Sequence, residues 1–200
     1  KVLDLIHTQA PELTDNEGAG DQGIMFGYAC KQTASLMPYP ISIANQLAER
    51  LAEVRKKQII KGLYPDGKVQ VTCNYNNGSQ ITVNHVLIST HHDSRYQDDR
   101  LFKDLKKSII QHVIHPIIHQ SQFPAENQIF INPKGKWIEN GGPSADTGLT
   151  GRKIITDTYG GWSRHGGGAF SGKDATKVDR SGAYMARYIA KTIVALNMAT

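Results

Sequence analysis

The sequence has 200 residues, of which 39% are hydrophobic and 20% charged, and its formal net charge is +5. This composition is typical of a soluble globular protein with one large domain or one and a half ordinary ones. No apolar run approaches the ~18 residues of a membrane span, and no basic run is interleaved with aromatic residues. We therefore expect neither a membrane nor a nucleic acid as partner. The two cysteines have no metal-ligand spacing and indicate reduced thiols in a cytoplasmic protein.

The first third of the chain predicts two short strands and one long helix. Residues 1–7 are expected to form the end of a strand, residues 12–23 a polar glycine-rich loop, and residues 24–28 another short strand. From Pro38 onward, apolar residues recur every three or four positions and predict an amphipathic helix. They are Ile41, Ala44, Leu47, Ala48, Leu51 and Val54. A helix with one apolar face covers a flat partner, for which a sheet is the expected candidate.

The middle third predicts a β-hairpin followed by a second helix. Alternating runs flank the Asn-Asn-Gly sequence at 76–78, a strong hairpin signal, and residues 86–90 extend the second strand or follow it as a buried one. Residues 64–68 read Tyr-Pro-Asp-Gly-Lys and predict a turn. A helix is expected over 98–118 and a strand over 129–132. The order gives an α+β layer with helices over one face of the sheet.

Three histidines lie near one face of that second helix: His112, His115 and His119. A metal site is one interpretation of this spacing. Surface or capping histidines are the favoured interpretation, because Pro116 breaks the helical geometry and no carboxylate joins the three rings.

The last third is basic and rich in glycine. A strand is expected over 154–158, a glycine-rich loop over 160–172 and a helix over 178–197. Residues 167–173 match the phosphate-loop pattern G-x-x-x-x-G-K, but Asp174 stands where that pattern has the Ser or Thr that holds magnesium. Backbone N–H groups of such a loop, followed by a helix start, favour anions. A polyphosphate site is the sharper interpretation, and a solvated glycine-rich loop is the alternative.

Further cations stand in neighbouring glycine-rich turns, namely Lys68, Arg152 and Lys153. Each of them alone is ordinarily a surface charge. Together with Lys173 and Lys177 they could stabilise a departing polyphosphate. A carboxylate of this region could hold a metal ion beside it, with Asp174 and Asp179 as candidates.

Three long stretches resemble the S-adenosylmethionine synthetase family (methionine adenosyltransferases). They are GAGDQGIMFGYA at 18–29, GLTGRKIITDTYGG at 148–161 and HGGGAFSGKDATKVDRS at 165–181. The resemblance runs from about Val2 to Ala199. It implies a reaction in which the sulfur of L-methionine attacks C5′ of ATP. Triphosphate leaves and is then hydrolysed to pyrophosphate and phosphate, with Mg²⁺ (about two ions per site) and K⁺ assisting.

The resemblance also implies a fold and a division of the chain. The family has repeated α/β units about a pseudo-threefold axis, with helices over one face of mixed or antiparallel sheets. Residues 1–16 would be the end of the first repeat and a gate loop, 17–150 the central domain and 151–200 the start of the C-terminal domain. Family members form homodimers, or homotetramers that are dimers of dimers, with active sites at the subunit interface.

Site residues follow from the resemblance position by position. ATP would contact Asp66, Gly67, Lys68, Lys136, Trp137, Asp146, Arg152, Lys153, Ala169 and Lys173. Methionine would contact Gln9, Asp146 and Lys177, and Mg²⁺ would be held by Asp179 and, with less support, Asp21. The catalytic cations would be Arg152, Lys153, Lys173 and Lys177, which neutralise the leaving triphosphate.

Several positions depart from the family pattern. Lys136-Trp137 replaces an Arg-Phe pair, which keeps a stacking ring but loses a bidentate fork. Ala145 stands where the family has glycine, and the gate loop between Gln9 and Asp21 is short. The family's N-terminal H-P-D-K segment and most of its last repeat are absent. We therefore expect a fragment of a synthetase that is inactive alone. The alternative is a regulatory partner of a full-length subunit. A generic phosphate-loop hydrolase is the third hypothesis.

Overall fold

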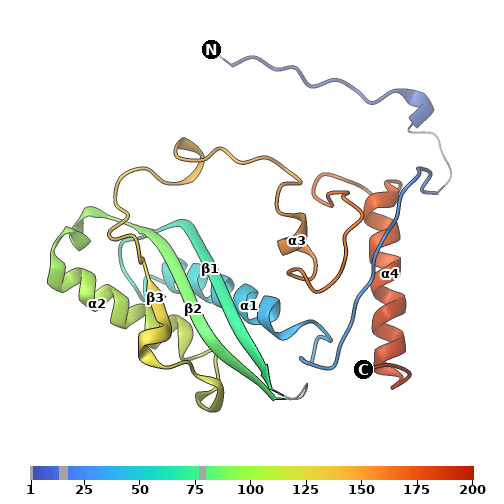
Figure 1. The fold of residues 1–200 in the computed structure, drawn as a ribbon. Helices are drawn as coiled ribbons and strands as arrows, with labels where there is room; N and C mark the ends of the chain where they lie inside the picture. The colour runs from blue at the N-terminus through green and yellow to red at the C-terminus, as the bar shows by residue number, and fades with distance from the viewer. Residues whose placement is uncertain (1, 14–17, 77–79) are drawn as a thin grey trace. The chain divides into compact units, whose positions relative to one another are not determined.

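The structure is a computed structural model that describes residues 2–13, 18–76 and 80–200. The chain divides into two units (Figure 1). Gln32–Leu149 forms one, here called the central unit, and Lys1–Lys31 with Thr150–Thr200 forms the other, here called the terminal unit. The mixture of helices with a small mixed sheet confirms the predicted α+β class. Of the helices described, none is long and apolar enough to cross a membrane.

The central unit contains a three-stranded sheet in the order β1-β2-β3. Strands β1 (Leu63–Asn76) and β2 (Gln80–His92) are antiparallel, which confirms the hairpin, although Asn77 and Gly78 of the predicted turn lie outside the described residues. Strand β3 (Ile129–Ile131) runs parallel to β2 and confirms the predicted third strand. The turn predicted at 64–68 is wrong, because this segment belongs to β1 and is only an irregularity in its pairing.

A bulge in the hairpin explains why the apolar pattern of β2 changes phase. Thr72 pairs with His85 and Cys73 pairs with Val83, so Asn84 has no counterpart on β1. An extra residue in one strand reverses the alternation of side chains between the two faces. Val83 and Val86 are therefore both buried although they are three residues apart. Residues 86–90 therefore extend the second strand of the hairpin, which is the first of the two predicted alternatives.

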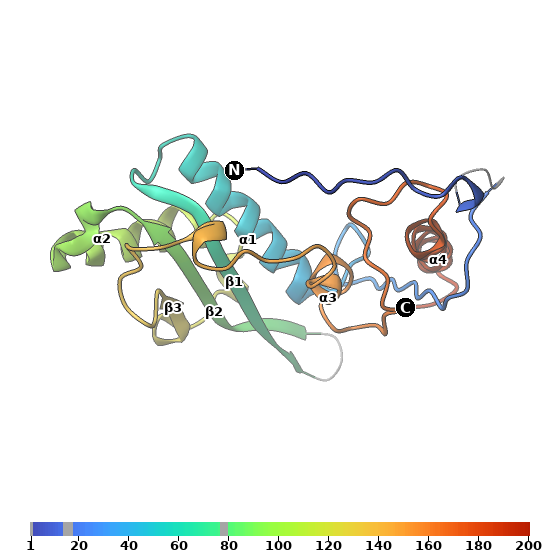
Figure 2. The ribbon, with the colours of Figure 1, turned by 90° about the horizontal axis from the view of Figure 1, so that it is seen from above.

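Helix α1 (Tyr39–Lys56) lies along one face of this sheet (Figures 1 and 2) and confirms the predicted amphipathic helix. Proline at its start suits a position where no backbone N–H is needed. Leu47 and Val54 are fully buried on the face turned to the sheet. They pack in the same core as Val86 and Ile88 of β2.

The second predicted helix is divided into two kinds of helix. Helix α2 (Asp99–Ile109) begins at the cap residue Asp98, whose carboxylate accepts the N–H groups of Arg100 and Leu101 at 2.8 and 3.1 Å. A π-helical turn, η3 (Ile110–Ile114), follows it. Its wider turn buries Val113 and Ile114 side by side, which a strict spacing of four does not predict.

Two of the three histidines after α2 serve local structure. His119 caps η4 (Gln120–Gln122) by accepting the Ser121 N–H at 3.3 Å. His115 stacks on Phe123 with ring centroids 4.4 Å apart. Within 2–13, 18–76 and 80–200, no three His, Cys, Asp or Glu side chains are grouped to hold a metal ion.

The terminal unit contains α3 (Ile154–Asp157) and the long helix α4 (Val178–Ala195), the latter as predicted. The strand predicted at 154–158 is wrong. Its β-branched residues favour a strand, but they form a helical turn closed by Asp157 N–H to Lys153 O at 2.9 Å and by the Thr158 hydroxyl to Ile154 O at 2.8 Å. The strands predicted at 1–7 and 24–28 are wrong as well, since the described residues there are extended without pairing in a sheet.

Short helical turns complete the described elements. They are the 3₁₀ helices η1 (Pro11–Leu13), η2 (Ser94–Gln97), η4, η5 (Glu126–Gln128) and η6 (Gly142–Ser144). Cys30 and Cys73 are free thiols, and burial raises the pKa of Cys73 to about 11.

Candidate functional site

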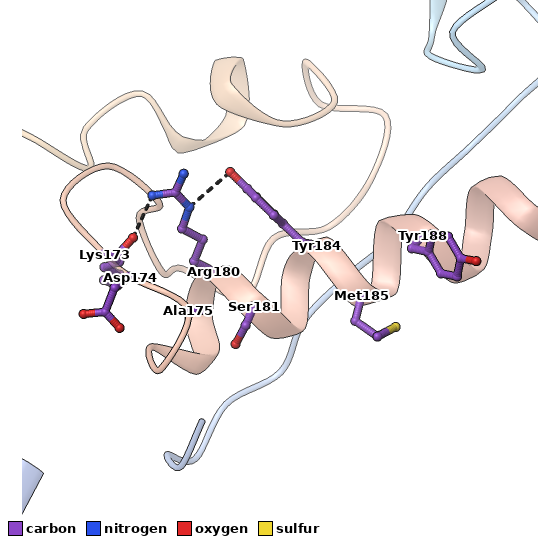
Figure 3. A pocket seen from close by; sticks show the side chains of 8 residues that line it. All are labelled: Lys173, Asp174, Ala175, Arg180, Ser181, Tyr184, Met185 and Tyr188. Atoms are coloured by element: carbon purple, nitrogen blue, oxygen red, sulfur yellow. Dashed lines mark hydrogen bonds between the residues drawn. The ribbon is translucent and has the colours of Figure 1, made fainter. Parts of the chain in front are cut away.

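Arg180 anchors the glycine-rich segment that precedes α4. Its guanidinium donates to the Lys173 carbonyl at 2.7 Å and to the Phe170 carbonyl at 3.3 Å, and its Nε donates to the Tyr184 hydroxyl at 3.2 Å (Figure 3). The first two of these contacts tie both ends of the turn at 170–173 to the first turn of α4, and the third lies within α4 itself. The sequence showed Arg180 only as one more basic residue. Its contacts are those of a residue that fixes the loop.

Lys173 and Asp179 form an ion pair at the start of α4. Nζ of Lys173 lies 2.6 Å from Oδ2 of Asp179, and both side chains are partly exposed, at 28% and 35%. The carboxylate stands in the first turn of the helix, where the helix dipole favours negative charge. Gly168 approaches this carboxylate so closely that a Cβ there would lie 2.2 Å from Asp179 Cγ. Only glycine fits at this position without displacing the ion pair.

The strand-loop-helix order of a phosphate loop is absent here, because α3 replaces the expected strand. Asp174 is bound locally: its Oδ1 accepts the Thr176 N–H at 2.8 Å and the Thr176 hydroxyl at 2.6 Å. The hydrogen bonds from Thr176 lower the pKa of Asp174. Asp174 thus shapes the turn before α4.

The extended segment 24–28 runs alongside α4 (Figure 1). A Cβ on Gly27 would lie 2.0 Å from the Ala186 carbonyl oxygen, so backbone meets backbone at this point. Arg187 of α4 donates to the Tyr28 carbonyl at 2.7 Å. A Cβ on Gly166 would lie 1.7 Å from the Ile24 carbonyl oxygen, so the same segment also touches the glycine-rich loop. These approaches explain why glycines recur in both stretches.

A cavity of ≈ 400 Å³ forms where the residues before this segment meet the start of α4. It is lined by Gln9, Gly20, Asp21, Lys173, Thr176, Lys177, Val178 and Asp179. Five of these are residues that the family resemblance assigns to the site: Gln9, Asp21, Lys173, Lys177 and Asp179. The structure thus brings together residues that are up to 170 positions apart. We call this cavity the cation pocket.

The cation pocket combines two lysines with two carboxylates. Carboxylate oxygens of Asp21 and Asp179 are the hard donors that suit Mg²⁺, which commonly takes one or two carboxylates together with phosphate and water oxygens. One oxygen of Asp179 is engaged by Lys173. The donor types therefore fit a magnesium ion whose remaining ligands come from a phosphate. Thr176, which the sequence did not single out, adds a hydroxyl that its contact with Asp174 already orients.

Arg152, Lys153 and Ala169 lie in the same unit but are absent from the described lining of the cation pocket. Arg152 and Lys153 are exposed just before α3, and Nζ of Lys153 contacts the Arg152 carbonyl at 3.3 Å. Ala169 packs against Gly151, where an added Cβ would lie 2.8 Å from the Ala169 Cβ.

A second cavity lies next to Arg180, with a volume of ≈ 630 Å³ (Figure 3). Its described lining is apolar and aromatic further along α4, with Tyr184, Met185 and Tyr188, and polar around the start of α4, with Arg180 of the helix and Lys173 and Asp174 of the loop. None of the residues along α4 is one that the sequence assigned to the site.

In the central unit, Lys136 and Trp137 line a cavity of ≈ 540 Å³ together with Gln97 and residues 138–140. Lys136 is already engaged, because Nζ donates to the Gln97 carbonyl at 2.6 Å and to the Asp99 carboxylate. The hydrogen bond from Lys136 lowers the pKa of Asp99. We call this cavity the tryptophan pocket.

The backbone of Trp137 is fixed by the buried His92. The Trp137 N–H donates to His92 Nε2 at 3.1 Å, and the His92 N–H donates to the Trp137 carbonyl at 3.0 Å. The imidazole must be unprotonated at Nε2 to accept this N–H. Burial lowers the pKa of His92, which favours the neutral ring that the contact requires.

The remaining predicted site residues of the central unit hold backbone or lie exposed. Asp66 accepts the Gly142 N–H at 2.7 Å, and Gly67 approaches the Ser89 carbonyl so closely that a Cβ would lie 3.2 Å from it. Lys68 and Asp146 are exposed, and Asp146 accepts the Gly148 N–H at 3.3 Å. The predicted residues of this unit therefore do not form one cluster within it.

Comparison with known protein families gives two adjacent matches. Residues 16–137 match the family model of the S-adenosylmethionine synthetase central domain. Residues 140–200 match that of the S-adenosylmethionine synthetase C-terminal domain. Together the matches include all residues of the cation pocket except Gln9, and all residues of the tryptophan pocket except Ile138 and Glu139.

Proposed function

The chain belongs to the S-adenosylmethionine synthetase family, and from that premise we propose that it provides part of a methionine adenosyltransferase active site. The substrates are ATP and L-methionine, and the product is S-adenosylmethionine. The observation that supports this proposal most is the cation pocket, in which two lysines, two carboxylates and Gln9 come together. A polyphosphate with a magnesium ion needs this combination of charges.

The reaction forms one bond and breaks another at the same carbon. The methionine sulfur attacks C5′ of the ribose, and the C5′–O bond breaks with its electron pair leaving on the triphosphate. Hydrolysis of the triphosphate then yields pyrophosphate and phosphate. The sulfur lone pair is already nucleophilic, so the protein has to position it rather than remove a proton. We assign this positioning to Gln9, Asp146 and Lys177.

Stabilisation of the leaving triphosphate falls to the cations of the terminal unit. We assign Lys173 and Lys177 to the phosphates from within the cation pocket, with the exposed Arg152 and Lys153 as further contacts. Fixed positive charges that meet developing negative charge lower the barrier without reorganisation during the step. The backbone at Ala169 is assigned to ATP as well.

Mg²⁺, when bound, neutralises phosphate charge and orients the triphosphate. Asp179 and Asp21 are the residues proposed to hold it. In the structure Asp179 is paired with Lys173 at 2.6 Å, so the two assignments require this ion pair to open when nucleotide binds. The partial exposure of both side chains allows that exchange. K⁺ is part of the proposal on family grounds.

For the adenine end of ATP, we assign Trp137 to stacking on the base. Further ATP contacts are assigned to Lys136, Asp66, Gly67 and Lys68. An indole face offers stacking to any nucleobase. We also propose that the active protein is a homodimer or a dimer of dimers, and that it acts in the cytoplasm, where free thiols such as Cys30 and Cys73 persist.

The test is a product assay on the complete gene product that contains this sequence. With ATP, L-methionine and Mg²⁺, S-adenosylmethionine, pyrophosphate and phosphate are expected in equal amounts, and omission of methionine should abolish the first product. Adding and withholding K⁺ shows whether it accelerates the reaction. Absence of S-adenosylmethionine would overturn the proposal and favour a non-catalytic partner of another subunit. Phosphate release from ATP without methionine would favour a hydrolase.

A further inference from the structure

His91 stands on β2 next to His92 but faces the other side of the strand, as adjacent strand residues do. Its imidazole lies between two aromatic rings. The Tyr64 ring centroid is 4.6 Å away on the neighbouring strand, and the Trp137 ring centroid is 5.4 Å away. His91 is half-buried. It is therefore the middle ring of a row of three tilted aromatic rings that ends in Trp137, the side chain assigned to adenine.

The same imidazole binds the backbone that follows Trp137. Its Nε2 lies 3.2 Å from the Ile138 carbonyl oxygen and 3.0 Å from the Glu139 carbonyl oxygen. Carbonyl oxygens only accept hydrogen bonds, so Nε2 carries the hydrogen and shares it between them. Gly141 completes the contact, because a Cβ there would lie 2.4 Å from Nδ1 of His91. Residues 137–141 thus wrap around this one ring.

The wall of the tryptophan pocket consists of the segment that His91 holds. Trp137, Ile138, Glu139 and Asn140 all line the cavity, and Trp137 Nε1 donates to the Asn140 carbonyl at 2.8 Å. An indole presents a useful stacking face only when its ring plane is fixed. We propose that His91 is a positioning residue for nucleotide binding, which sets the ring of Trp137 and the course of residues 138–141. This inference rests on the assignment of Trp137 to adenine in the proposed function.

His91 contributes an aromatic ring and an N–H donor, and two variants separate these contributions. His91→Gln keeps an N–H donor for the carbonyls of Ile138 and Glu139 but removes the ring between Tyr64 and Trp137. His91→Phe keeps a ring but removes the donor. A residue that only fills space would tolerate Phe best, whereas a residue that holds the backbone through its N–H would tolerate Gln best.

The kinetic test uses the complete gene product. His91→Phe should raise the KM for ATP about tenfold while kcat and the KM for methionine change less than about twofold, and His91→Gln should raise the KM for ATP by only about twofold to threefold. The matched control is His85→Gln, which alters a half-buried histidine of the same strand that stacks on Phe130 instead, and its KM for ATP should equal the wild type. Equal KM values for ATP in wild type and His91→Phe would overturn the inference.

A spectroscopic readout separates this inference from the proposed reaction. The sequence has two tryptophans, so Trp162→Phe leaves Trp137 as the single indole fluorophore. In that background His91→Phe should at least double acrylamide quenching of Trp137, and His85→Gln should not change it. If the wild type makes no S-adenosylmethionine, the proposed reaction fails while this comparison still decides whether His91 holds Trp137. Unchanged quenching in His91→Phe would overturn the positioning role.

Discussion

The two units of the chain position their side chains by different means. The central unit has a continuous buried core between α1, α2 and the sheet, in which Leu47, Ile88 and Ile109 are fully buried. In the terminal unit, α4 exposes large apolar side chains such as Met185 at 57% and Tyr188 at 67%. There the predicted catalytic residues are held by close backbone approaches and polar contacts. The central unit therefore rests on an apolar core, whereas close glycine approaches and polar contacts hold the cation pocket.

This difference predicts opposite sensitivities in the two units. Truncating an apolar side chain should damage the central unit, whose apolar contacts provide its stability. Adding a single methyl group should damage the terminal unit, where glycines allow backbone to touch backbone. Removing a charge from the cation pocket should affect catalysis more than stability.

The largest effect on stability is expected from Leu105→Ala. Leu105 is 1% exposed in the core of the central unit, so its truncation should lower the free energy of unfolding by about 2–5 kcal/mol. Denaturant unfolding followed by hydrogen exchange at the amides of β2 measures this. Leu101→Ala on the same helix is the control, because Leu101 is 45% exposed and should cost under about 0.5 kcal/mol. Equal losses for the two variants would show that the core is not where the structure places it.

The next largest effect concerns catalysis. Lys173→Ala should cost on the order of 2–4 kcal/mol of transition-state stabilisation, a fall of about 30-fold to 1000-fold in kcat/KM, because one preorganised charge on the triphosphate is lost. Steady-state kinetics of the complete gene product measure it. Lys191→Ala, an exposed lysine on the same helix α4, should leave the rate unchanged. An unaltered turnover in Lys173→Ala would remove Lys173 from the proposed mechanism.

A smaller effect is expected from Gly27→Ala. The new Cβ would lie 2.0 Å from the Ala186 carbonyl oxygen, so the segment must move away from α4 at a cost of about 1–3 kcal/mol. Hydrogen exchange of the α4 amides should speed up, while that of β2 stays unchanged. Gly20→Ala tests whether position matters, since its Cβ would meet no atom within 4 Å and its stability should equal the wild type. Slower or equal exchange in Gly27→Ala would contradict the contact.

The smallest effect is a pH dependence in the central unit. Burial lowers the pKa of His92 below its ordinary value of 6.5, so the unfolded chain binds this proton more readily than the folded chain. The contribution of His92 to the free energy of unfolding should be complete above about pH 6.5 and should decline as the pH falls from there toward the lower pKa of the folded state. Denaturant titrations at several pH values should show a shallower decline in His92→Gln than in wild type. Identical slopes would contradict a neutral His92 that accepts the Trp137 N–H.

Local patterns predicted the elements whose partners lie close in sequence. The apolar spacing from Ile41 to Val54 gave α1, and the Asn-Asn-Gly sequence gave the hairpin, because both signals are short-range. The strand prediction for residues 154–158 was wrong, because their β-branched side chains favour a strand but the described chain offers them no strand to pair with. The strand prediction for residues 24–28 was wrong for a related reason, because this segment packs along a helix rather than in a sheet.

For the candidate site, residue types could be predicted from the sequence better than their contacts. Lys173 and Asp179 lie six residues apart across a helix start, so their ion pair is within reach of sequence reasoning. The contact of Lys136 with Asp99 spans 37 positions and depends on how the sheet and α2 pack, which no local pattern encodes. The roles of Arg152 and Lys153 stay predictions.

Binding of inorganic tripolyphosphate to the complete gene product tests the central claim most directly, because this ligand has the charge of the leaving group without the base. Calorimetry in the presence of Mg²⁺ should show binding in the wild type that Lys173→Ala weakens by at least tenfold and Trp137→Ala leaves unchanged. Binding of adenosine should be weakened by Trp137→Ala and left unchanged by Lys173→Ala. Tripolyphosphate affinity that is equal in wild type and Lys173→Ala would contradict the assignment of the cation pocket to the triphosphate.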